Sequence, residues 1–357
     1  MAQFHPLVVK DIRRETPECV SIAFDVPADL VEHFHFEAGQ NVTLRRFIEG
    51  EEVRRSYSIC SSPHEKELRV AIKMLSDGKF SSHANLHLKM GDTVEVLPPT
   101  GRFSNRPNAS KASRYLAFAA GSGITPVISI IKATLAAEPE CVFTLVYGNK
   151  NRNTIIFREQ LEALKNRYIN RFIIHHVFSR EQTDAPINYG RIDVERCEMM
   201  AKYLFKPEMM DHIFICGPEE MIFTVRDWLM NRGIHKEKIH FELFSVPGEK
   251  MRDNSTTKIH HAEKMSRVRL KLDGATITYE LPFDGSSVLD GALRMGADLP
   301  YACKGGVCAT CRAKLIRGEV EMDTNYALEA EELAAGYILT CQSHPRTTEV
   351  DIDFDAK

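Results

Sequence analysis

Residues 115–137 read YLAFAAGSGITPVISIIKATLAA and divide into an apolar run, a loop with two glycines and a second, longer apolar segment. The run 115–120 is typical of a buried strand, and the periodicity of 127–137 is typical of a helix. The alternation continues to residue 233, with strand-like runs at 142–148, 172–178 and 212–217 and helix-like segments at 154–168 and 219–233. Strands that alternate with helices predict a parallel, doubly wound α/β sheet.

The first hundred residues have a different pattern, in which short β-rich runs are separated by turn residues. The runs lie at 40–47, 68–75 and 92–98, and glycines and prolines punctuate them, for example Gly39 and Gly91. This pattern predicts an antiparallel sheet closed into a small β-barrel.

A polar stretch without periodicity follows the α/β segment and predicts a linker at 248–265. Beyond it, residues 268–281 hold two short strand-like runs around an Asp-Gly turn, which predicts a β-hairpin. A short helix at 286–296, a cysteine-rich loop and a last strand region complete an α+β unit. A chain of 357 residues is longer than one that a single hydrophobic core usually stabilises. We therefore predict a multidomain protein, with a β-barrel at 1–110, an α/β domain at 111–247 and an α+β domain at 266–357.

Composition limits the kinds of partner. Hydrophobic residues make up 43% and charged residues 27% of the chain, and the net charge of −3 gives no basic surface for nucleic acid. The longest apolar runs are well short of the ~20 residues that span a bilayer, and the first residues do not resemble a signal peptide. We expect a cytoplasmic protein that binds neither nucleic acid nor membrane.

Four of the nine cysteines lie close together near the C-terminus: Cys303, Cys308, Cys311 and Cys341. The first three follow the spacing C-x4-C-x2-C and the fourth comes after twenty-nine further residues, which is the ligand pattern of plant-type [2Fe–2S] clusters. Two glycines in the loop allow its backbone to bend toward the cluster. The alternative is a four-cysteine zinc site, but such sites usually have two cysteine knuckles, and Cys341 has no neighbouring cysteine.

The remaining cysteines and the paired histidines carry no such pattern. Cys19, Cys60, Cys141 and Cys197 are interpreted as reduced, partly buried thiols. The pairs His175-His176 and His260-His261 lack the carboxylate or cysteine neighbours of a metal site.

The loop Gly121-Ser122-Gly123-Ile124-Thr125-Pro126 follows a predicted strand and opens a predicted helix, the geometry that a dinucleotide phosphate needs. A second short motif, Cys216-Gly217-Pro218, follows about 95 residues later. The sequence Arg55-Ser56-Tyr57-Ser58 ends a predicted barrel strand, and it resembles the R-x-Y-S signature of the ferredoxin–NADP reductase superfamily.

This resemblance implies specific roles for residues in the flavin site. Arg55 is expected to bind the flavin phosphates, Tyr57 to stack on the isoalloxazine, and Ser58 to lie near its reactive nitrogen. The segment 77–83 is similar to the family's G-x-x-S stretch, and it places Gly78, Ser81 and Ser82 at a helix start that binds the pyrophosphate. A site for two phosphates implies FAD rather than FMN.

The nicotinamide motifs are also similar to those of the family. G-x-G-I-T-P and CGP occur together in it, which implies nucleotide binding by Gly121, Gly123, Thr125 and Pro126 and by Gly217 and Pro218, with Cys216 near the nicotinamide. The stretch Phe241-Glu242-Leu243-Phe244 resembles the end of this domain, with Glu242 at the hydride-transfer site and Phe244 covering the flavin; simple core packing is the alternative for both. Ser179-Arg180 resembles the site for the adenosine 2′-phosphate, and it implies a preference for NADPH over NADH.

Residues 300–311, PYACKGGVCATC, resemble the cluster loop of plant-type ferredoxins, with Ala309 where many members have Gly or Ser. The resemblance covers 266–357 and implies a β-grasp fold. The order of domains, reductase first and ferredoxin last, resembles the reductase subunits of phenylacetyl-CoA epoxidases and their relatives.

The resemblance implies that electrons pass from NADPH through FAD to the [2Fe–2S] cluster and then to an oxygenase component, expected to be a diiron enzyme acting on an aryl-CoA thioester. The ferredoxin module has 10 Lys/Arg against 15 Asp/Glu, which favours a less acidic partner. The alternatives are the reductase of a Rieske or other hydroxylase system and a non-catalytic redox-sensing iron–sulfur module.

Overall fold

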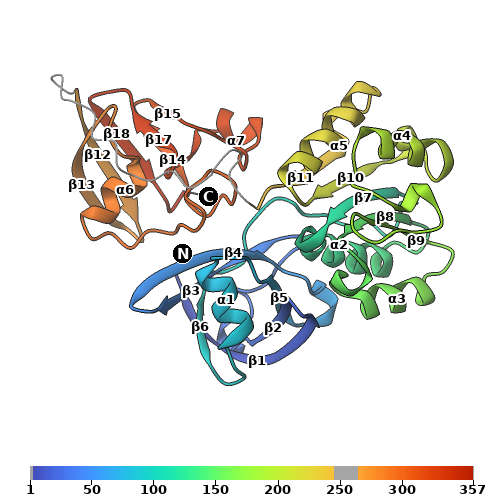
Figure 1. Ribbon diagram of the computed structural model, residues 1–357. Helices are drawn as coiled ribbons and strands as arrows, with labels where there is room; N and C mark the ends of the chain where they lie inside the picture. The colour runs from blue at the N-terminus through green and yellow to red at the C-terminus, as the bar shows by residue number, and fades with distance from the viewer. Residues whose placement is uncertain (1–2, 245–263, 357) are drawn as a thin grey trace. The chain divides into compact units, whose positions relative to one another are not determined.

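The computed structural model describes residues 3–244 and 264–356 (Figure 1). Most of the predicted linker at 248–265 lies outside the described residues. The chain forms two compact units, one of Phe4–Leu243 and one of Phe244–Lys357 with Met1–Gln3. Within the described residues, no helix has both the length and the apolar character needed to cross a membrane.

The N-terminal half of the first unit is the predicted antiparallel barrel (Figure 1). Its strands are β1 (His5–Thr16), β2 (Cys19–Asp25), β3 (Asn41–Ile48), β4 (Glu51–Ser58), β5 (Leu68–Lys73) and β6 (Thr93–Val96). They pair in the order β4-β3-β6-β1-β2-β5, and a bridge between Ile59 and Val70 brings the two edges together. Helix α1 (Lys79–Leu86) packs Phe80 and Ala84 into the barrel core.

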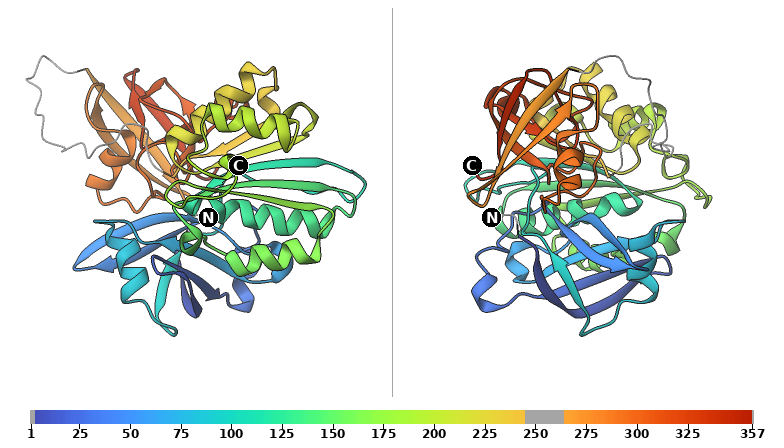
Figure 2. Two further views of the ribbon diagram at one scale, coloured as in Figure 1. Left: turned by 45° about the vertical axis from the view of Figure 1, so that its right-hand side comes forward. Right: turned by 90° about the vertical axis from the view of Figure 1, so that its left-hand side faces the viewer.

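The second half of this unit is a parallel sheet in the order β11-β10-β7-β8-β9. Its strands are β7 (Arg114–Ala120), β8 (Val142–Asn149), β9 (Phe172–Phe178), β10 (His212–Cys216) and β11 (Ile239–Glu242). The helices are α2 (Ile124–Ala137), α3 (Arg158–Arg167), α4 (Val194–Tyr203) and α5 (Glu219–Asn231). Figure 2 shows helices on both faces of the sheet, as a doubly wound fold requires.

The two faces of this sheet have separate cores. Tyr115 of β7 belongs to the cluster that includes α2 and Leu161 of α3. Phe118, three residues later, points to the opposite face, where its ring meets those of Phe205 and Trp228. Side chains alternate across a strand, so β7 is buried on both faces and its sequence is apolar throughout.

Two helices differ from the sequence prediction. The helix predicted from residue 154 begins at Arg158, because Phe157 has a left-handed backbone with φ 61°. Helix α4 was not predicted: only three of its residues, Cys197, Met200 and Ala201, are buried, so its apolar stripe is narrow.

The second unit is the predicted α+β domain, and its described residues form a mixed sheet in the order β13-β12-β18-β14-β16 beside a β15-β17 ribbon. The strands are β12 (Met265–Leu272), β13 (Ala275–Pro282), β14 (Arg312–Arg317), β15 (Val320–Met322), β16 (Tyr337–Leu339), β17 (Ser343–Pro345) and β18 (Glu349–Asp353), and the helices are α6 (Val288–Arg294) and α7 (Ala330–Ala334). Strand β12 is antiparallel to β13 and parallel to β18. The turn of the predicted hairpin is at Asp273 and Gly274, both with positive φ.

Candidate functional site

The flavin motif lies along β4, where successive side chains point to opposite sides. Tyr57 packs its ring 5.6 Å from that of Phe80 on α1, so the end of β4 meets the start of that helix. Arg55 is exposed and donates a hydrogen bond from Nη1 to the carbonyl of Arg54. Ser56 faces the other way, and its hydroxyl is 3.0 Å from that of Thr43.

The start of α1 can hold an anion. Its N-cap residue, Gly78, provides no side-chain cap, so the first amides of the helix keep their capacity to bind a phosphate. Ser81 is buried; its hydroxyl accepts from the amide of Leu75 and donates to the carbonyl of Gly78, which fixes the turn. Ser82 is half-buried. With Arg55 on the neighbouring strand, this arrangement fits a flavin with two phosphates.

The nicotinamide motifs meet where β7 and β10 end. Gly123 lies so close to β10 that a Cβ atom there would be 2.0 Å from the carbonyl oxygen of Cys216, so only glycine fits without a backbone shift. Thr125 donates its hydroxyl to the carbonyl of Ser122, and Pro126 is buried in the first turn of α2. Gly217 and Pro218 follow Cys216 directly. The carboxyl ends of parallel strands are where nucleotides bind in such sheets.

The three predicted catalytic residues come together although they are distant in sequence. Cys216 and Glu242 are paired in the register of β10 and β11, and the Ser58 hydroxyl donates to Glu242 Oε2 at 3.1 Å. Burial, with the Glu242 carboxylate nearby, raises the pKa of Cys216, so this thiol stays neutral. Phe244 is 44% exposed and belongs to the second compact unit, so its role over the flavin stays a prediction.

Lys73, at the end of β5, was missed by the sequence analysis. A Cβ atom on Gly121 would lie 3.7 Å from its Nζ, which places an ammonium beside the glycine loop. Tyr147 fixes the same loop by donating its hydroxyl to the carbonyl of Gly121. The available signal was a lysine directly after the apolar residues Val70, Ala71 and Ile72.

Ser179 and Arg180 lie just beyond the end of β9. Their amides donate to the carbonyls of Asn149 and Lys150, which extends the pairing with β8. Arg180 is exposed, and the next residue, Glu181, forms an ion pair with Arg152. The acidic neighbour is therefore already paired, and the Arg180 guanidinium remains accessible to a ligand.

The four clustered cysteines lie in two pairs. Cys303 is within hydrogen-bonding distance of Cys308, and Cys311 of Cys341. The hydrogen bond from Cys303 lowers the pKa of Cys308. Among the described residues, no group of three or more histidine, cysteine, aspartate or glutamate side chains is arranged to hold a single metal ion. Two pairs suit a binuclear cluster, in which each iron has two protein ligands.

The other cysteines, Cys19, Cys60, Cys141 and Cys197, are buried and unpaired by disulfides, as the sequence predicts. Burial raises the pKa of Cys19 to about 12 and that of Cys197 to about 12, so these thiols are inert.

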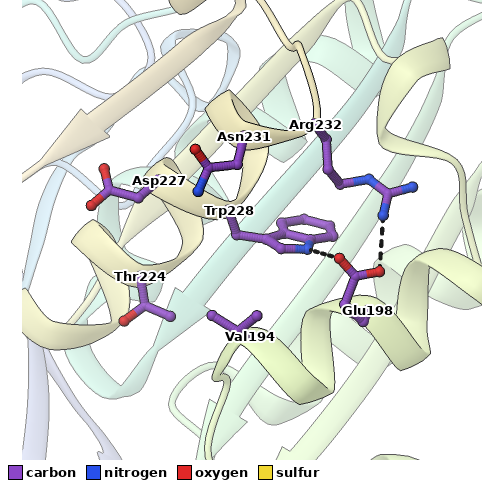
Figure 3. Close-up of a pocket in the computed structure, with 7 residues that line it drawn as sticks. All are labelled: Val194, Glu198, Thr224, Asp227, Trp228, Asn231 and Arg232. Atoms are coloured by element: carbon purple, nitrogen blue, oxygen red, sulfur yellow. Dashed lines mark hydrogen bonds and ion pairs between the residues drawn. The ribbon is translucent and has the colours of Figure 1, made fainter.

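A surface pocket of about 470 Å³ lies between α4 and α5 (Figure 3). At its edge, Glu198 accepts a hydrogen bond from the Trp228 indole at 2.7 Å and pairs with Arg232. None of the predicted site residues lines this pocket, so it is separate from the cofactor sites.

Comparison with known proteins identifies all three domains. An oxidoreductase FAD-binding domain matches residues 6–105, an oxidoreductase NAD-binding domain 118–227 and a 2Fe-2S iron-sulfur cluster binding domain 270–346. One component of the 1,2-phenylacetyl-CoA epoxidase of Escherichia coli K12 is 44% identical over 100% of this chain and 99% of its own. The ferredoxin reductase component of the 3-ketosteroid-9-alpha-monooxygenase of Rhodococcus rhodochrous is 34% identical over 98% of this chain and 96% of its own.

The solved structures agree on the fold. Phthalate dioxygenase reductase, with 23% identity, superimposes with a TM-score of 0.59 over 98% of each chain. The chain belongs to the family of flavin- and iron–sulfur-containing reductases that supply electrons to oxygenase components. It is an NAD(P)H-dependent electron-transfer enzyme, and the [2Fe–2S] interpretation of its cysteine spacing is confirmed over the zinc alternative. The exact domain boundaries stay a prediction.

Proposed function

We propose that this chain takes electrons from NADPH and delivers them to a diiron epoxidase that acts on an aryl-CoA thioester. The observation that carries the proposal is the 44% identity, over the whole chain, to the component of the Escherichia coli epoxidase. The reductase components of 3-ketosteroid and glycine betaine monooxygenases are less similar, at 34% and 31%. The domain order and a complete set of cofactor motifs argue against a non-catalytic sensor.

We assign the hydride-transfer site to Ser58, Cys216 and Glu242. When bound, FAD would supply the chemistry that links the two-electron hydride of the nicotinamide to the one-electron [2Fe–2S] centre. The chain's contribution is position and polarity: the hydrogen bond from Ser58 to Glu242 fixes a polar pair, and the neutral Cys216 thiol supplies an uncharged wall for the nicotinamide.

We assign the phosphates of the two nucleotides to the uncapped start of α1 and to the glycine loop before α2. Arg55 and the first amides of α1 bind those of FAD, with Tyr57 against the flavin ring. The glycine loop Gly121–Gly123 and the Lys73 ammonium beside it bind those of the nicotinamide nucleotide. The cluster is assigned to Cys303, Cys308, Cys311 and Cys341.

The preference for NADPH rests on Arg180 and Ser179 at the end of β9. A guanidinium fork and a hydroxyl suit the dianionic 2′-phosphate, which NADH lacks. Arg180→Ala should raise KM for NADPH about tenfold or more and leave KM for NADH nearly unchanged, because a charge-assisted contact contributes about 1.5–3 kcal/mol. An equal effect on both nucleotides would refute this assignment.

The partner is tested by reconstitution. In the first reaction, the chain is mixed with the remaining components of the Escherichia coli epoxidase, NADPH and phenylacetyl-CoA, and product formation is measured. In the second reaction, the chain is mixed with NADPH, the oxygenase component of the R. rhodochrous 3-ketosteroid-9-alpha-monooxygenase and its steroid. We expect turnover in the first reaction only, and it should weaken with salt because exposed charges are screened over about 8–10 Å. Faster turnover in the second would favour the alternative, the reductase of a Rieske or other hydroxylase system. No turnover even with ferricyanide would favour the sensor.

A further inference from the structure

The side chain of Gln342 is placed against the cysteine sulfur that precedes it. It is 7% exposed, and its amide nitrogen, Nε2, lies 3.5 Å from Cys341 Sγ, within hydrogen-bonding distance for sulfur. The same nitrogen lies 2.8 Å from the carbonyl oxygen of Lys304 and 3.0 Å from that of Cys341. The two amide hydrogens therefore have three acceptors within reach.

These contacts join the two parts of the cluster site. Lys304 and Gly306 both have positive φ, which bends the cysteine loop back on itself. A Cβ atom on Gly306 would lie 3.2 Å from Gln342 Cγ, so the glutamine stem packs directly beneath the bend. One amide hydrogen therefore holds the loop through the carbonyl of Lys304, and the other is shared between the carbonyl oxygen and Sγ of Cys341.

A hydrogen bond to a ligand sulfur acts differently on the two oxidation states of a cluster. The reduced cluster carries one more negative charge than the oxidised cluster, and part of that charge resides on the thiolate sulfurs. A buried donor stabilises the more negative state more, and it raises the reduction potential. The amide of Gly305 donates similarly to Cys303 Sγ at 3.3 Å, but that donor belongs to the backbone and is present whatever the side chain.

We propose that Gln342 is a positioning residue that raises the reduction potential of the [2Fe–2S] cluster through its amide hydrogen bond to Cys341 Sγ. The inference rests on the proposed ligation by the four cysteines. A higher potential makes the cluster a better acceptor of electrons from the flavin. The side chain of Gln342 would therefore influence how readily electrons reach the cluster that passes them to the partner.

The test is Gln342→Met in the full-length protein with its cofactors. Methionine keeps the length and the packing beneath Gly306 and removes the donor. We expect iron and sulfide per chain to equal those of the unmodified protein, and the equilibrium constant for cluster reduction to fall about tenfold, which is about 59 mV for one electron. A redox titration followed by the EPR signal of the reduced cluster measures this. A fully loaded variant with an unchanged potential would overturn the proposal.

Asn325 provides a matched control. It is also an amide side chain that supports a neighbouring loop, since its Oδ1 accepts from the amide of Leu328 at 2.8 Å and its Nδ2 donates to the carbonyl of Leu328 at 2.9 Å. It has no hydrogen bond to a cysteine sulfur among the described residues. Asn325→Leu should lower stability and leave the potential unchanged; an equal drop in potential would show that loop support alone causes the effect.

A measurement on the unmodified protein keeps the test valid if Gln342→Met loses its cluster. With ¹⁵N in the glutamine side chains, pulsed EPR of the reduced cluster should detect a coupling from Nε2, and its absence would refute the contact. If the unmodified protein itself binds no iron and sulfide, the proposed ligation fails, and this result is distinct from failure of the Gln342 proposal.

Discussion

The cysteine site and the hydride-transfer site are constructed in opposite ways. Three of the four cluster cysteines lie within nine residues of each other, so local chain geometry brings them together. Ser58 and Glu242 are 184 residues apart, and they meet only because the barrel packs against the α/β sheet. A local site should be lost by changing one of its own residues, whereas a site assembled from distant segments should also respond to changes in packing between those segments.

The largest expected effect is at the local site. Cys308→Ser should abolish the iron–sulfur absorbance and lower the rate of cytochrome c reduction to less than about one hundredth of that of the unmodified protein. Even the residues that hold metal ligands in place can contribute 10–100-fold to metal affinity, so loss of a ligand itself should cost at least as much. NADPH–ferricyanide activity should stay close to that of the unmodified protein, since its site lies in the other compact unit. Steady-state assays with the two acceptors measure this.

The control for this variant is Cys197→Ala, which removes a buried thiol on α4, outside the cysteine cluster. It should keep both activities. Equal loss of ferricyanide and cytochrome c reduction in Cys308→Ser would show that the cysteine site and the hydride-transfer site are not independent. The contrast drawn between a local site and a site assembled from distant segments would then fail.

A smaller effect is expected at the distant pair. Ser58→Ala and Glu242→Ala should each slow flavin reduction by NADPH about a hundredfold, the size typical of a lost positioned polar group in an active site. Because each residue acts through their shared hydrogen bond, the double variant should be little slower than the worse single variant. Stopped-flow absorbance measures the rates. Fully additive losses would mean that the two side chains act separately.

A change in the packing between the two nucleotide motifs should have a smaller effect again, and this effect should be on nucleotide binding. Gly123→Ala places a methyl group against the backbone of Cys216, and such overpacking typically costs about 1–3 kcal/mol. We expect KM for NADPH to rise about tenfold with FAD still bound. Gly217→Ala is the milder control, because the nearest atom to its Cβ, at 2.7 Å, is the flexible end of Met221. A larger effect of Gly217→Ala would argue against close packing at Gly123 as the controlling contact.

The same contrast explains what the sequence could predict. The barrel and the α/β sheet were predicted from periodicity, the β-grasp fold was implied by the family resemblance, and the four cysteines were proposed as ligands from their spacing. The meeting of Ser58 with Glu242 depends on packing across 184 residues, so only family resemblance suggested it. Lys73 and Gln342 were not predicted, because a lysine at a strand end or a glutamine after a cysteine becomes informative only when the fold places it beside Gly121 or the cysteine loop.

The smallest effect on activity is expected from a change that affects only the stability of the α/β domain. His240 on β11 stacks on Phe214 at 5.0 Å and on His212 at 5.8 Å, and its Nε2 is buried without a hydrogen-bond partner among the described residues. Burial, with a smaller contribution from His212, lowers the pKa of His240 to about 4. The folded protein therefore holds this imidazole neutral at pH values where the unfolded chain protonates it.

The pH dependence follows from this difference. As the pH falls from about 6.5 to about 4, the unfolded state gains a proton that the folded state does not, so stability decreases by roughly 3 kcal/mol at most and then levels off. His240→Phe keeps a ring in the stack and removes the titration. It should match the unmodified protein at pH 7.5 and lose less stability at pH 4.5, whereas a change at the exposed His235 should have no such effect. Fluorescence of Trp228, the only tryptophan in the chain, reports unfolding of this domain specifically, and an identical pH profile for His240→Phe and the unmodified protein would contradict a buried neutral His240.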